Sequence, residues 1–393
     1  MSAFSELRDL DATHVMQTYG RLPVAFVRGE GSRLWDSEGK EYLDFLCGLA
    51  VTSLGHAHPR IAAAIADQAA TLLHVSNLYY NDVQPRLAAA IDGLAGGGGR
   101  VFFANSGAEA NECAIKLVRR HGQRNGGPER FHVISAYRSF HGRTLTTLAA
   151  TGQPQKQETF QPLPPGFRQV EFGDVDALAA AMDERVAGVM LEAVQAEGGV
   201  HPADDDYLHA VRRLCDEREA LLVFDEVQTG LGRTGEWFGF QHSGVAADVF
   251  SMAKALGNGV PIGACWARDE VAAAFAAGDH ATTFGGQPLA ARAALEVLAV
   301  MQEEDIPTRA RRAGARLAGA VGSLAGVESV RGRGLLLAAE LGAGADAKAV
   351  AEACLDHGLV VNAVTPTALR LTPSLLVTDA EIDAAVAILG AVL

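Results

Sequence analysis

The chain has 393 residues, of which 49% are hydrophobic and 20% are charged, and its formal net charge is -14. This composition predicts a globular protein with two domains, or one large domain with a smaller partner. The acidic balance disfavours nucleic acid and anionic membrane surfaces as partners. No apolar run reaches the length of about 20 residues that a membrane-spanning helix needs.

The five cysteines are odd in number and widely spaced, with no CxxC pair. They indicate a reduced protein with neither a disulfide framework nor a zinc site, and we expect no bound metal. The first segment, MSAFSELRDLDATHVMQ, has early acids and no apolar centre, unlike a secretory signal. These features predict a cytoplasmic location.

Residues 1–48 are expected to form an N-terminal arm. Its segment FVRGEGSRLWDSEGKEYLDFL predicts a short antiparallel meander with turns at Gly31 and Gly39. Two amphipathic helices should follow, over PRIAAAIADQAATL and VQPRLAAAIDGLAG, and a glycine cluster should end the second.

After these helices the chain alternates between short apolar strands and helices. The predicted strands are RVFFAN, RFHVISA, AGVMLEAV, ALLVFDEV, ADVFSMA and IGACWAR, and DEVAAAFA should form the last helix of the series. Strands that are apolar on both faces and lie between helices predict an α/β domain with a mostly parallel sheet, here over residues 49–287. Residues 288–393 should form a smaller α+β domain, with which the arm packs.

Ligands of parallel sheets bind at the carboxyl ends of the strands, and three such ends carry polar residues. After RVFFAN, Ser106 and Glu109 can form a capping box, and the same helix N-terminus, opened by Gly107, can bind a phosphate. The same residues also fit an ordinary helix N-terminus that binds no ligand. After ALLVF comes Asp225, and after ADVFSMA comes Lys254.

Two other sequence patterns that could bind a ligand lack the accompanying motif or flanking elements that such sites require. Asp225 and Glu226 could hold Mg²⁺ in a nucleotidase, but the chain has no GxxxxGK[ST] motif. The GLGRTG segment matches GxGxxG, but it does not directly follow a strand and no clear helix follows it. His56 and His58 lack an evident third metal ligand, so we expect a structural role for both.

One cofactor needs a phosphate site, a carboxylate and a lysine together, and that cofactor is pyridoxal phosphate. The carboxylate keeps the pyridine nitrogen protonated, so that the ring can take up the electrons of a carbanion, and the lysine forms an imine with the aldehyde. Burial and the cationic ring would lower the pKa of Lys254 from about 10.4 towards neutrality. The freed amine would then act as a proton-shuttling base. Asp225 and Lys254 are therefore the predicted catalytic residues.

From about Tyr19 to its end, the chain resembles the class III (fold-type I) aminotransferases, and most of all those that act on acetylornithine. The segments that carry the resemblance are LDFLCGLAVTSLGHAHP, HVSNLYYN, FFANSGAEANECAIKLVR, FHGRT, LVFDEVQTGLGRTG, SMAKALGNGVPIGA, TTFGGQPLA, VRGRGLLLAAEL and LRLTPSLLVT. The resemblance implies a fold-type I domain with a seven-stranded, mostly parallel sheet. It also implies a homodimer with shared active sites.

The implied reaction transfers the δ-amino group of N2-acetyl-L-ornithine to 2-oxoglutarate, in arginine biosynthesis. Ornithine, succinylornithine, succinyldiaminopimelate and 4-aminobutyrate remain alternative donors, and an aminomutase shares the fold. A non-catalytic cofactor-binding regulator is the alternative of a different class. It would need a DNA- or partner-binding appendage, and the motifs leave no room for one.

The resemblance also implies the roles of the cofactor-binding residues. Phe140 would stack on the pyridine ring, Val227 would pack on its other face, and Gln228 would lie near the phenolic oxygen. Thr283 would reach the phosphate of the neighbouring subunit's cofactor. The remaining cofactor-binding residues would be Ser106, Gly107 and Ala108 at the phosphate, Asp225 at the ring nitrogen and Lys254 at the aldehyde.

Four residues are implied to bind substrate. Arg143 would bind the carboxylate remote from the reacting nitrogen, and Arg370 the α-carboxylate of glutamate or 2-oxoglutarate, because rigid guanidinium forks suit carboxylates. Glu197 would pair with Arg370 when no α-carboxylate is bound. Thr282 would offer a hydroxyl to the substrate. Each arginine also fits a surface ion pair, and Glu197 also fits a plain loop acid.

The chain departs from the family pattern in two segments. The family's EPIQGEGG reads EAVQAEGG at residues 192–199, where Ala193 and Ala196 should stiffen or shift the loop that holds Glu197. The family's GSTFGGNP reads ATTFGGQP, where Gln287 replaces an asparagine, and the sequence gives no basis for predicting the effect of that change.

Overall fold

The computed structural model describes residues 3–393, so the first two residues of the predicted arm lie outside the described residues. Its central feature is a seven-stranded sheet in the order β4-β12-β11-β10-β7-β5-β6. Only β12 runs antiparallel to its neighbours, β11 and β4. The predicted mostly parallel sheet is confirmed. The strands are β4 (Gly99–Ala104), β5 (His132–Ala136), β6 (Phe167–Val170), β7 (Val186–Leu191), β10 (Leu221–Asp225), β11 (Val249–Met252) and β12 (Gly263–Arg268).

Both faces of this sheet are buried, which explains why its strands are apolar without alternation. Leu221 and Val223 pack on one face against α5 (Gly107–Gly126), and Leu222 and Phe224 face the other side. On that side the rings of Phe238 and Phe250 lie 4.5 Å apart between their centroids. The other helices and short strands of this region are α3 (Pro59–Thr71), α4 (Gln84–Ala95), α6 (Leu145–Ala150), α7 (Pro154–Gln157), α8 (Val175–Ala181), β8 (Val194–Gln195), β9 (His201–Pro202), α9 (Asp205–Glu217) and α10 (Asp269–Ala272).

The helix predicted over DEVAAAFA is shorter than expected, because α10 ends at Ala272. Beyond it, Ala274 and Phe275 donate backbone hydrogen bonds three residues back, and the Asp279 carboxylate accepts one from the N–H of Ala276. The chain therefore tightens into turns instead of continuing the helix.

The N-terminal arm and the C-terminal segment share a small sheet. It has the order β1-β2-β3-β15, in which the antiparallel meander β1–β3 is extended by β15 in parallel with β3. Gly31 and Gly39 have positive φ angles of 55° and 86°, as the predicted turns require. The elements are α1 (Ala3–His14), β1 (Phe26–Glu30), β2 (Arg33–Asp36), β3 (Glu41–Asp44), α2 (Cys47–Ala50) and β15 (Leu359–Val360).

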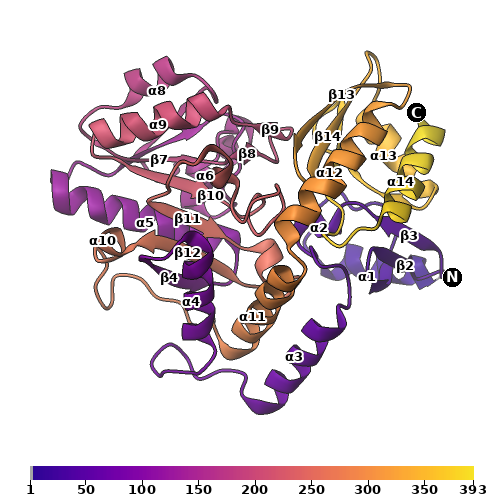
Figure 1. The fold of residues 1–393 in the computed structure, drawn as a ribbon, viewed down its shortest axis with the longest axis horizontal. Coiled ribbons are helices and arrows are strands. Elements are labelled where there is room, and N and C mark those ends of the chain that lie inside the picture. The colour runs from indigo at the N-terminus through magenta and orange to yellow at the C-terminus, as the bar shows by residue number, and fades with distance from the viewer. Residues whose placement is uncertain (1–2) are drawn as a thin grey trace.

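The rest of the C-terminal segment is an antiparallel sheet, β13-β14-β17-β16, with helices beside it. Figure 1 shows these strands and helices on one side of the molecule and the seven-stranded sheet on the other. The chain passes between the two parts along α11, which packs on α3 and α4. The bounds 1–48, 49–287 and 288–393 stay a prediction. The elements are α11 (Pro288–Glu303), α12 (Ile306–Gly322), β13 (Val327–Arg333), β14 (Leu336–Leu341), α13 (Ala347–Asp356), β16 (Asn362–Ala363), β17 (Ala368–Leu371) and α14 (Asp379–Val392).

The GLGRTG segment holds these parts together through Arg233, which is 1% exposed. Its guanidinium donates hydrogen bonds to the carbonyls of Leu335 and Pro373 and to Ser53 Oγ, at 3.1, 2.6 and 3.0 Å. These three hydrogen bonds from a buried cation explain the segment as a structural bridge between distant parts of the chain. Within residues 3–393, no helix combines the length and hydrophobicity that crossing a membrane requires.

Candidate active site

A cavity of about 400 Å³ lies where β4, β10 and β11 end. The strand-end argument therefore identified the right edge of the sheet. Ten of the predicted site residues line it, and Arg370, Thr282 and Thr283 do not. The ten are Ser106, Gly107, Ala108, Phe140, Arg143, Glu197, Asp225, Val227, Gln228 and Lys254.

Lys254 lies two residues beyond the end of β11 and begins a single 3₁₀ turn, η3 (Lys254–Leu256). Its φ angle is 43°, in the left-handed region that a non-glycine residue enters at a cost of about 1–3 kcal/mol. Burial lowers the pKa of Lys254 to about 8, against the opposing effect of the Glu197 carboxylate. The lowered pKa increases the neutral fraction of the amine near neutral pH, and the neutral form is the one that acts as nucleophile and base.

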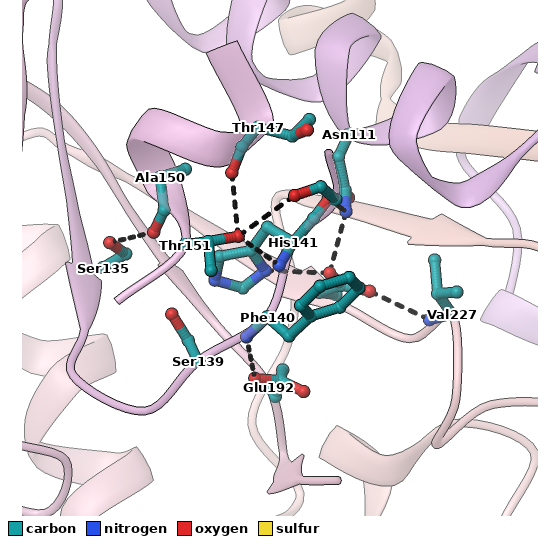
Figure 2. Close-up of polar contacts among 12 residues, drawn as sticks. Asn111, Ser135, Ser139, Phe140, His141, Thr147, Ala150, Thr151, Glu192 and Val227 are labelled. Atoms are coloured by element: carbon teal, nitrogen blue, oxygen red, sulfur yellow. Dashed lines mark hydrogen bonds and ion pairs between the residues drawn. The ribbon is translucent and has the colours of Figure 1, made fainter. Parts of the chain in front are cut away.

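Asp225 ends β10 and is 4% exposed. Its Oδ2 accepts hydrogen bonds from Asn111 Nδ2 and His141 Nδ1, both at 2.8 Å, and its Oδ1 accepts one from the N–H of Val227 at 3.1 Å (Figure 2). Because an ionised carboxylate has no proton to give, His141 carries its proton on Nδ1. The network fixes the position of the Asp225 carboxylate at the cavity wall.

Glu192 lies close to this network and directly follows the last residue of β7. Its Oε2 accepts a hydrogen bond from the N–H of Phe140 at 3.1 Å (Figure 2). Burial, and after it the charge of Asp225, raise the pKa of Glu192 well above its ordinary value. Burial and the neighbouring carboxylate thus favour the neutral form of Glu192, whose side chain positions the backbone of Phe140.

The N-terminus of α5 opens into the cavity through Ser106, Gly107 and Ala108. Ser106 Oγ accepts a hydrogen bond from the N–H of Glu109 at 3.2 Å, as expected of an N-cap. The predicted capping box is wrong in its second bond, which should run from the N–H of Ser106 to the Glu109 carboxylate. The Glu109 carboxylate instead reaches one residue further and accepts from the N–H of Asn105, at 2.8 Å.

Gly107 and Gly263 allow close packing around this helix end, which leaves its N-terminus open to a ligand. A Cβ added to Gly107 would lie 2.8 Å from Val227 Cγ1, and one added to Gly263 would lie 2.2 Å from the carbonyl oxygen of Ser106. Larger residues at either position would push the α5 N-terminus away from its neighbours. The free N–H groups and the dipole of a 20-residue helix suit a phosphate here.

Arg370 lies on β17 and is 1% exposed, deep beside the cavity. Its Nη1 contacts Glu197 Oε1 at 2.5 Å and Gln228 Oε1 at 3.1 Å. Burial raises the pKa of Glu197, but Arg370 and Lys254 outweigh that effect, and the net pKa lies below the ordinary value. The loop that contains Ala193 and Ala196 thus brings Glu197 against Arg370, and the effect of the two alanines on this loop stays a prediction.

The remaining predicted substrate and cofactor residues lie at the rim or outside the cavity. Arg143 is exposed, with its guanidinium carbon 5.6 Å from the centroid of the Phe140 ring. Thr282 Oγ1 accepts a hydrogen bond from the N–H of Gly285 at 3.1 Å, within its own loop. Thr283 is exposed and lies outside the cavity of this chain.

The cavity residues that sequence reasoning missed include Asn111, His141 and Glu192. The strand-end rule could have identified Glu192, because it directly follows the last residue of β7. His141 belongs to the FHGRT segment, but nothing in the sequence predicts that its side chain contacts Asp225. Glu226 is the opposite case: its carboxylate accepts from the N–H groups of Gly239 and Phe240, so it fixes a loop.

Three features of the cavity fit pyridoxal phosphate. A helix N-terminus suits the phosphate, a buried anionic Asp225 suits a protonated ring nitrogen, and the amine of Lys254 suits the aldehyde. Within residues 3–393, no cluster of three His, Cys, Asp or Glu side chains is placed to hold a metal ion. The fold and the cavity thus define a pyridoxal-phosphate enzyme of the fold-type I class.

Comparison with known proteins identifies the family. Residues 15–393 match the family Aminotransferase class-III. The chain is 47% identical over 381 residues to the acetylornithine aminotransferase of Methanocaldococcus jannaschii, covering 96% of this chain and 95% of that protein. It is 49% identical over 384 residues to that of Gloeobacter violaceus, covering 96% and 95%.

A solved structure agrees with this family. The ornithine aminotransferase of Toxoplasma gondii, with PLP at partial occupancy in its active site, superposes with a TM-score of 0.95 at 34% identity, covering 100% of this chain and 94% of that one. The chain belongs to the class III aminotransferases, and its cofactor is pyridoxal 5'-phosphate.

Proposed function

We propose that this enzyme transfers the δ-amino group of N2-acetyl-L-ornithine to 2-oxoglutarate, giving N-acetyl-L-glutamate 5-semialdehyde and L-glutamate, in arginine biosynthesis. The observation that carries the proposal is the Glu197–Arg370 pair beside Lys254. The names of the relatives from M. jannaschii and G. violaceus support the donor. The structural likeness to ornithine aminotransferase supports ornithine as the second candidate.

When bound, pyridoxal phosphate supplies an aldehyde that accepts an amino group and a protonated ring that takes up an electron pair. The α5 N-terminus with Ser106 would bind its phosphate, and Asp225 would hold the proton on its ring nitrogen. Lys254 Nζ would bond to the aldehyde carbon. Once the substrate amine has displaced it, the same amine would take a proton from the substrate carbon that bears the amino group and deliver it to the former aldehyde carbon.

The two arginines would distinguish the two substrates by the positions of their carboxylates. Arg143 at the rim would bind the carboxylate remote from the reacting nitrogen, in either substrate. The reacting end of N-acetylornithine has no carboxylate, so Arg370 would stay paired with Glu197. Glutamate has an α-carboxylate there, which would displace Glu197 and take over the guanidinium. One pocket would thus accept both substrates.

Steady-state turnover of the cofactor-loaded enzyme tests the donor. With 2-oxoglutarate as the acceptor, kcat/KM should be highest for N-acetylornithine and lower for ornithine, succinylornithine, succinyldiaminopimelate and 4-aminobutyrate. Formation of glutamate in proportion to semialdehyde would exclude an aminomutase. A higher kcat/KM for another donor would replace N-acetylornithine and leave the aminotransferase chemistry unchanged.

Glu197→Gln should separate the two half-reactions. The change keeps the shape of the side chain and removes the charge that neutralises Arg370, a pairing worth about 1.5–3 kcal/mol for a charged hydrogen bond. We expect kcat/KM for N-acetylornithine to fall roughly 10- to 100-fold, while the value for glutamate stays the same or rises. Rapid mixing with each substrate separately measures both. An equal loss with both substrates would contradict the pairing role.

We further infer that two copies of the chain form a dimer with shared sites. The loop after α3 and the loop before α11 are joined by Asn77, whose Nδ2 donates to the carbonyls of Thr282 and Gly285 at 3.0 and 3.1 Å. They present an exposed apolar surface around Thr283, formed by Leu73, Leu78, Tyr79, Tyr80 and Phe284. Exposed patches of this kind are typical of protein interfaces.

Mixed dimers test the shared site. Thr283→Val removes a hydroxyl that would bind the partner's cofactor phosphate, and should weaken cofactor binding roughly 10- to 100-fold. A mixed dimer of Thr283→Val with Lys254→Ala has one site with both defects and one site with neither. Mixing two impaired variants should therefore restore about half of the wild-type activity per dimer at limiting cofactor. No recovery, or a monomer in sedimentation, would contradict the shared site.

The proposed location is the cytoplasm. All five cysteines are buried and free, which suits a reducing compartment.

A further inference from the structure

Two cationic side chains converge on one aromatic ring at the rim of the cavity. Lys156 Nζ lies 5.3 Å, and the guanidinium carbon of Arg143 lies 5.6 Å, from the centroid of the Phe140 ring. Arg143 is exposed, and Lys156 is half-buried. Within the part of the chain that the structure describes, neither charged group has a carboxylate at ion-pair distance or a hydrogen-bond acceptor. Phe140 and Arg143 line the cavity, and Lys156, which is not among the lining residues, lies beside it against the Phe140 ring.

The position of Lys156 is fixed by its neighbours on α7. Gln153 Nε2 donates to the carbonyl of Ser139 at 3.0 Å, and Gln157 Nε2 donates to the carbonyl of Thr151 at 2.7 Å. The N–H of Lys156 itself donates to the carbonyl of Gln153 at 2.9 Å. The short helix is thereby attached through Gln153 to the loop that carries Phe140 and through Gln157 to Thr151, the C-cap of α6.

The two cations repel each other in the absence of an anion. Burial lowers the pKa of Lys156, and Arg143 lowers it further, against an opposing effect of Glu197. Glu197 is held by Arg370 and is not in hydrogen-bond contact with Lys156. Like charges kept together without a counter-ion are costly, and a carboxylate placed between them would convert the repulsion into two charge-assisted contacts.

We propose that Lys156 is a specificity-determining residue: with Arg143 it binds the carboxylate remote from the reacting nitrogen, and it disfavours donors that carry a free ammonium beside that carboxylate. This inference rests on the proposed function. In N-acetylornithine the group beside this carboxylate is a neutral amide. In ornithine it is an ammonium, which two cations repel. The remote carboxylate of glutamate would use the same subsite.

Two substitutions of Lys156 test the proposal in the cofactor-loaded enzyme. Lys156→Gln removes the charge and keeps much of the stem, and Lys156→Arg restores the charge. With Lys156→Gln, KM for N-acetylornithine should rise about 10-fold, the loss expected for one charge-assisted contact, with kcat within about twofold. The ratio of kcat/KM for N-acetylornithine over ornithine should fall about 10-fold, because ornithine is then repelled less. Lys156→Arg should keep both values near wild type.

The matched control is Lys348→Gln, since this lysine lies on α13 with a side chain that is 78% exposed. It should leave both KM and the donor ratio unchanged. An unchanged donor ratio in Lys156→Gln, within about twofold, would overturn the selectivity role.

Binding of glutarate, a dicarboxylate with no amino group, gives a readout that does not depend on turnover. Calorimetry on the cofactor-loaded enzyme should show about 10-fold weaker binding to Lys156→Gln than to wild type or Lys348→Gln. Equal binding would overturn the carboxylate role. A wild-type enzyme that does not convert N-acetylornithine would contradict the proposed function, and glutarate would still decide whether Lys156 binds the remote carboxylate.

Discussion

Lys254→Ala should abolish transamination, lowering kcat by at least about 10³-fold, because it removes both the nucleophile and the proton-transfer base. Borohydride should no longer fix the cofactor to the protein, which intact-mass measurement can follow. In the wild type, capture of the aldehyde by cofactor-free enzyme should accelerate as pH rises towards about 8 and level off above it, because the pKa of Lys254 is lowered to about 8 and only the neutral amine attacks.

Lys348→Ala is the control for this change, because its exposed ammonium lies on α13, outside the cavity. It should retain both the borohydride adduct and full activity. A cofactor that is still fixed to the Lys254→Ala protein would show that another lysine is the nucleophile.

Asp225→Asn should have the second largest effect. The buried carboxylate is replaced by a neutral group of the same shape, which cannot hold a proton on the ring nitrogen. Breaking a buried charge pair costs about 3–5 kcal/mol, so kcat should fall by about 10²- to 10⁴-fold. A cofactor analogue methylated on the ring nitrogen carries a fixed positive charge, and it should recover part of the activity of this variant in single-turnover assays.

Glu226→Gln is the matched control, because Glu226 is the neighbouring buried acid and its oxygens accept from loop N–H groups. It should keep the visible absorbance of the bound cofactor and lower the free energy of unfolding instead. Full activity of Asp225→Asn, or a failure of the methylated analogue to help it, would contradict the proposed role of Asp225.

Much of the fold is readable from the sequence because local signals agree with the tertiary environment. The strands around Val223 and Phe250 are apolar on both faces, and both faces are buried. The turn glycines Gly31 and Gly39 adopt the positive φ angles that their positions require. The helix predicted through Ala276 failed because the Asp279 carboxylate binds the N–H of Ala276 and stabilises a turn, a contact that helix propensity does not report.

The site is readable only where its residues lie at the ends of strands or within two residues of them. Asp225 and Lys254 do, and the sequence places them correctly at one sheet edge. The partners of Asp225 do not, because Asn111 lies inside α5 and His141 lies in a loop, and only the packed fold brings their side chains to the carboxylate. The positive φ angle of Lys254 is likewise imposed by tertiary packing.

The contact between Glu197 and Arg370 is likewise one that only the packed fold shows. The two residues are far apart in sequence, and the alanines near Glu197 favoured a disturbed loop. In the fold, Arg370 reaches Glu197 from β17 and is further held by Gln228, so the pair forms in spite of the departures. The resemblance to class III aminotransferases implied this pairing, whereas the positions of Glu197 and Arg370 in the sequence predict no distance between their side chains.

The central claim is that one pocket accepts two different substrates by pairing or freeing Arg370. Single-turnover half-reactions test it most directly: the cofactor-loaded enzyme is mixed separately with N-acetylornithine, glutamate, ornithine and 4-aminobutyrate, and the loss of the lysine-bound cofactor absorbance is followed. Rapid loss with N-acetylornithine and with glutamate, and slow loss with ornithine and 4-aminobutyrate, is the expected result. Rapid loss with N-acetylornithine and none with glutamate would contradict the claim.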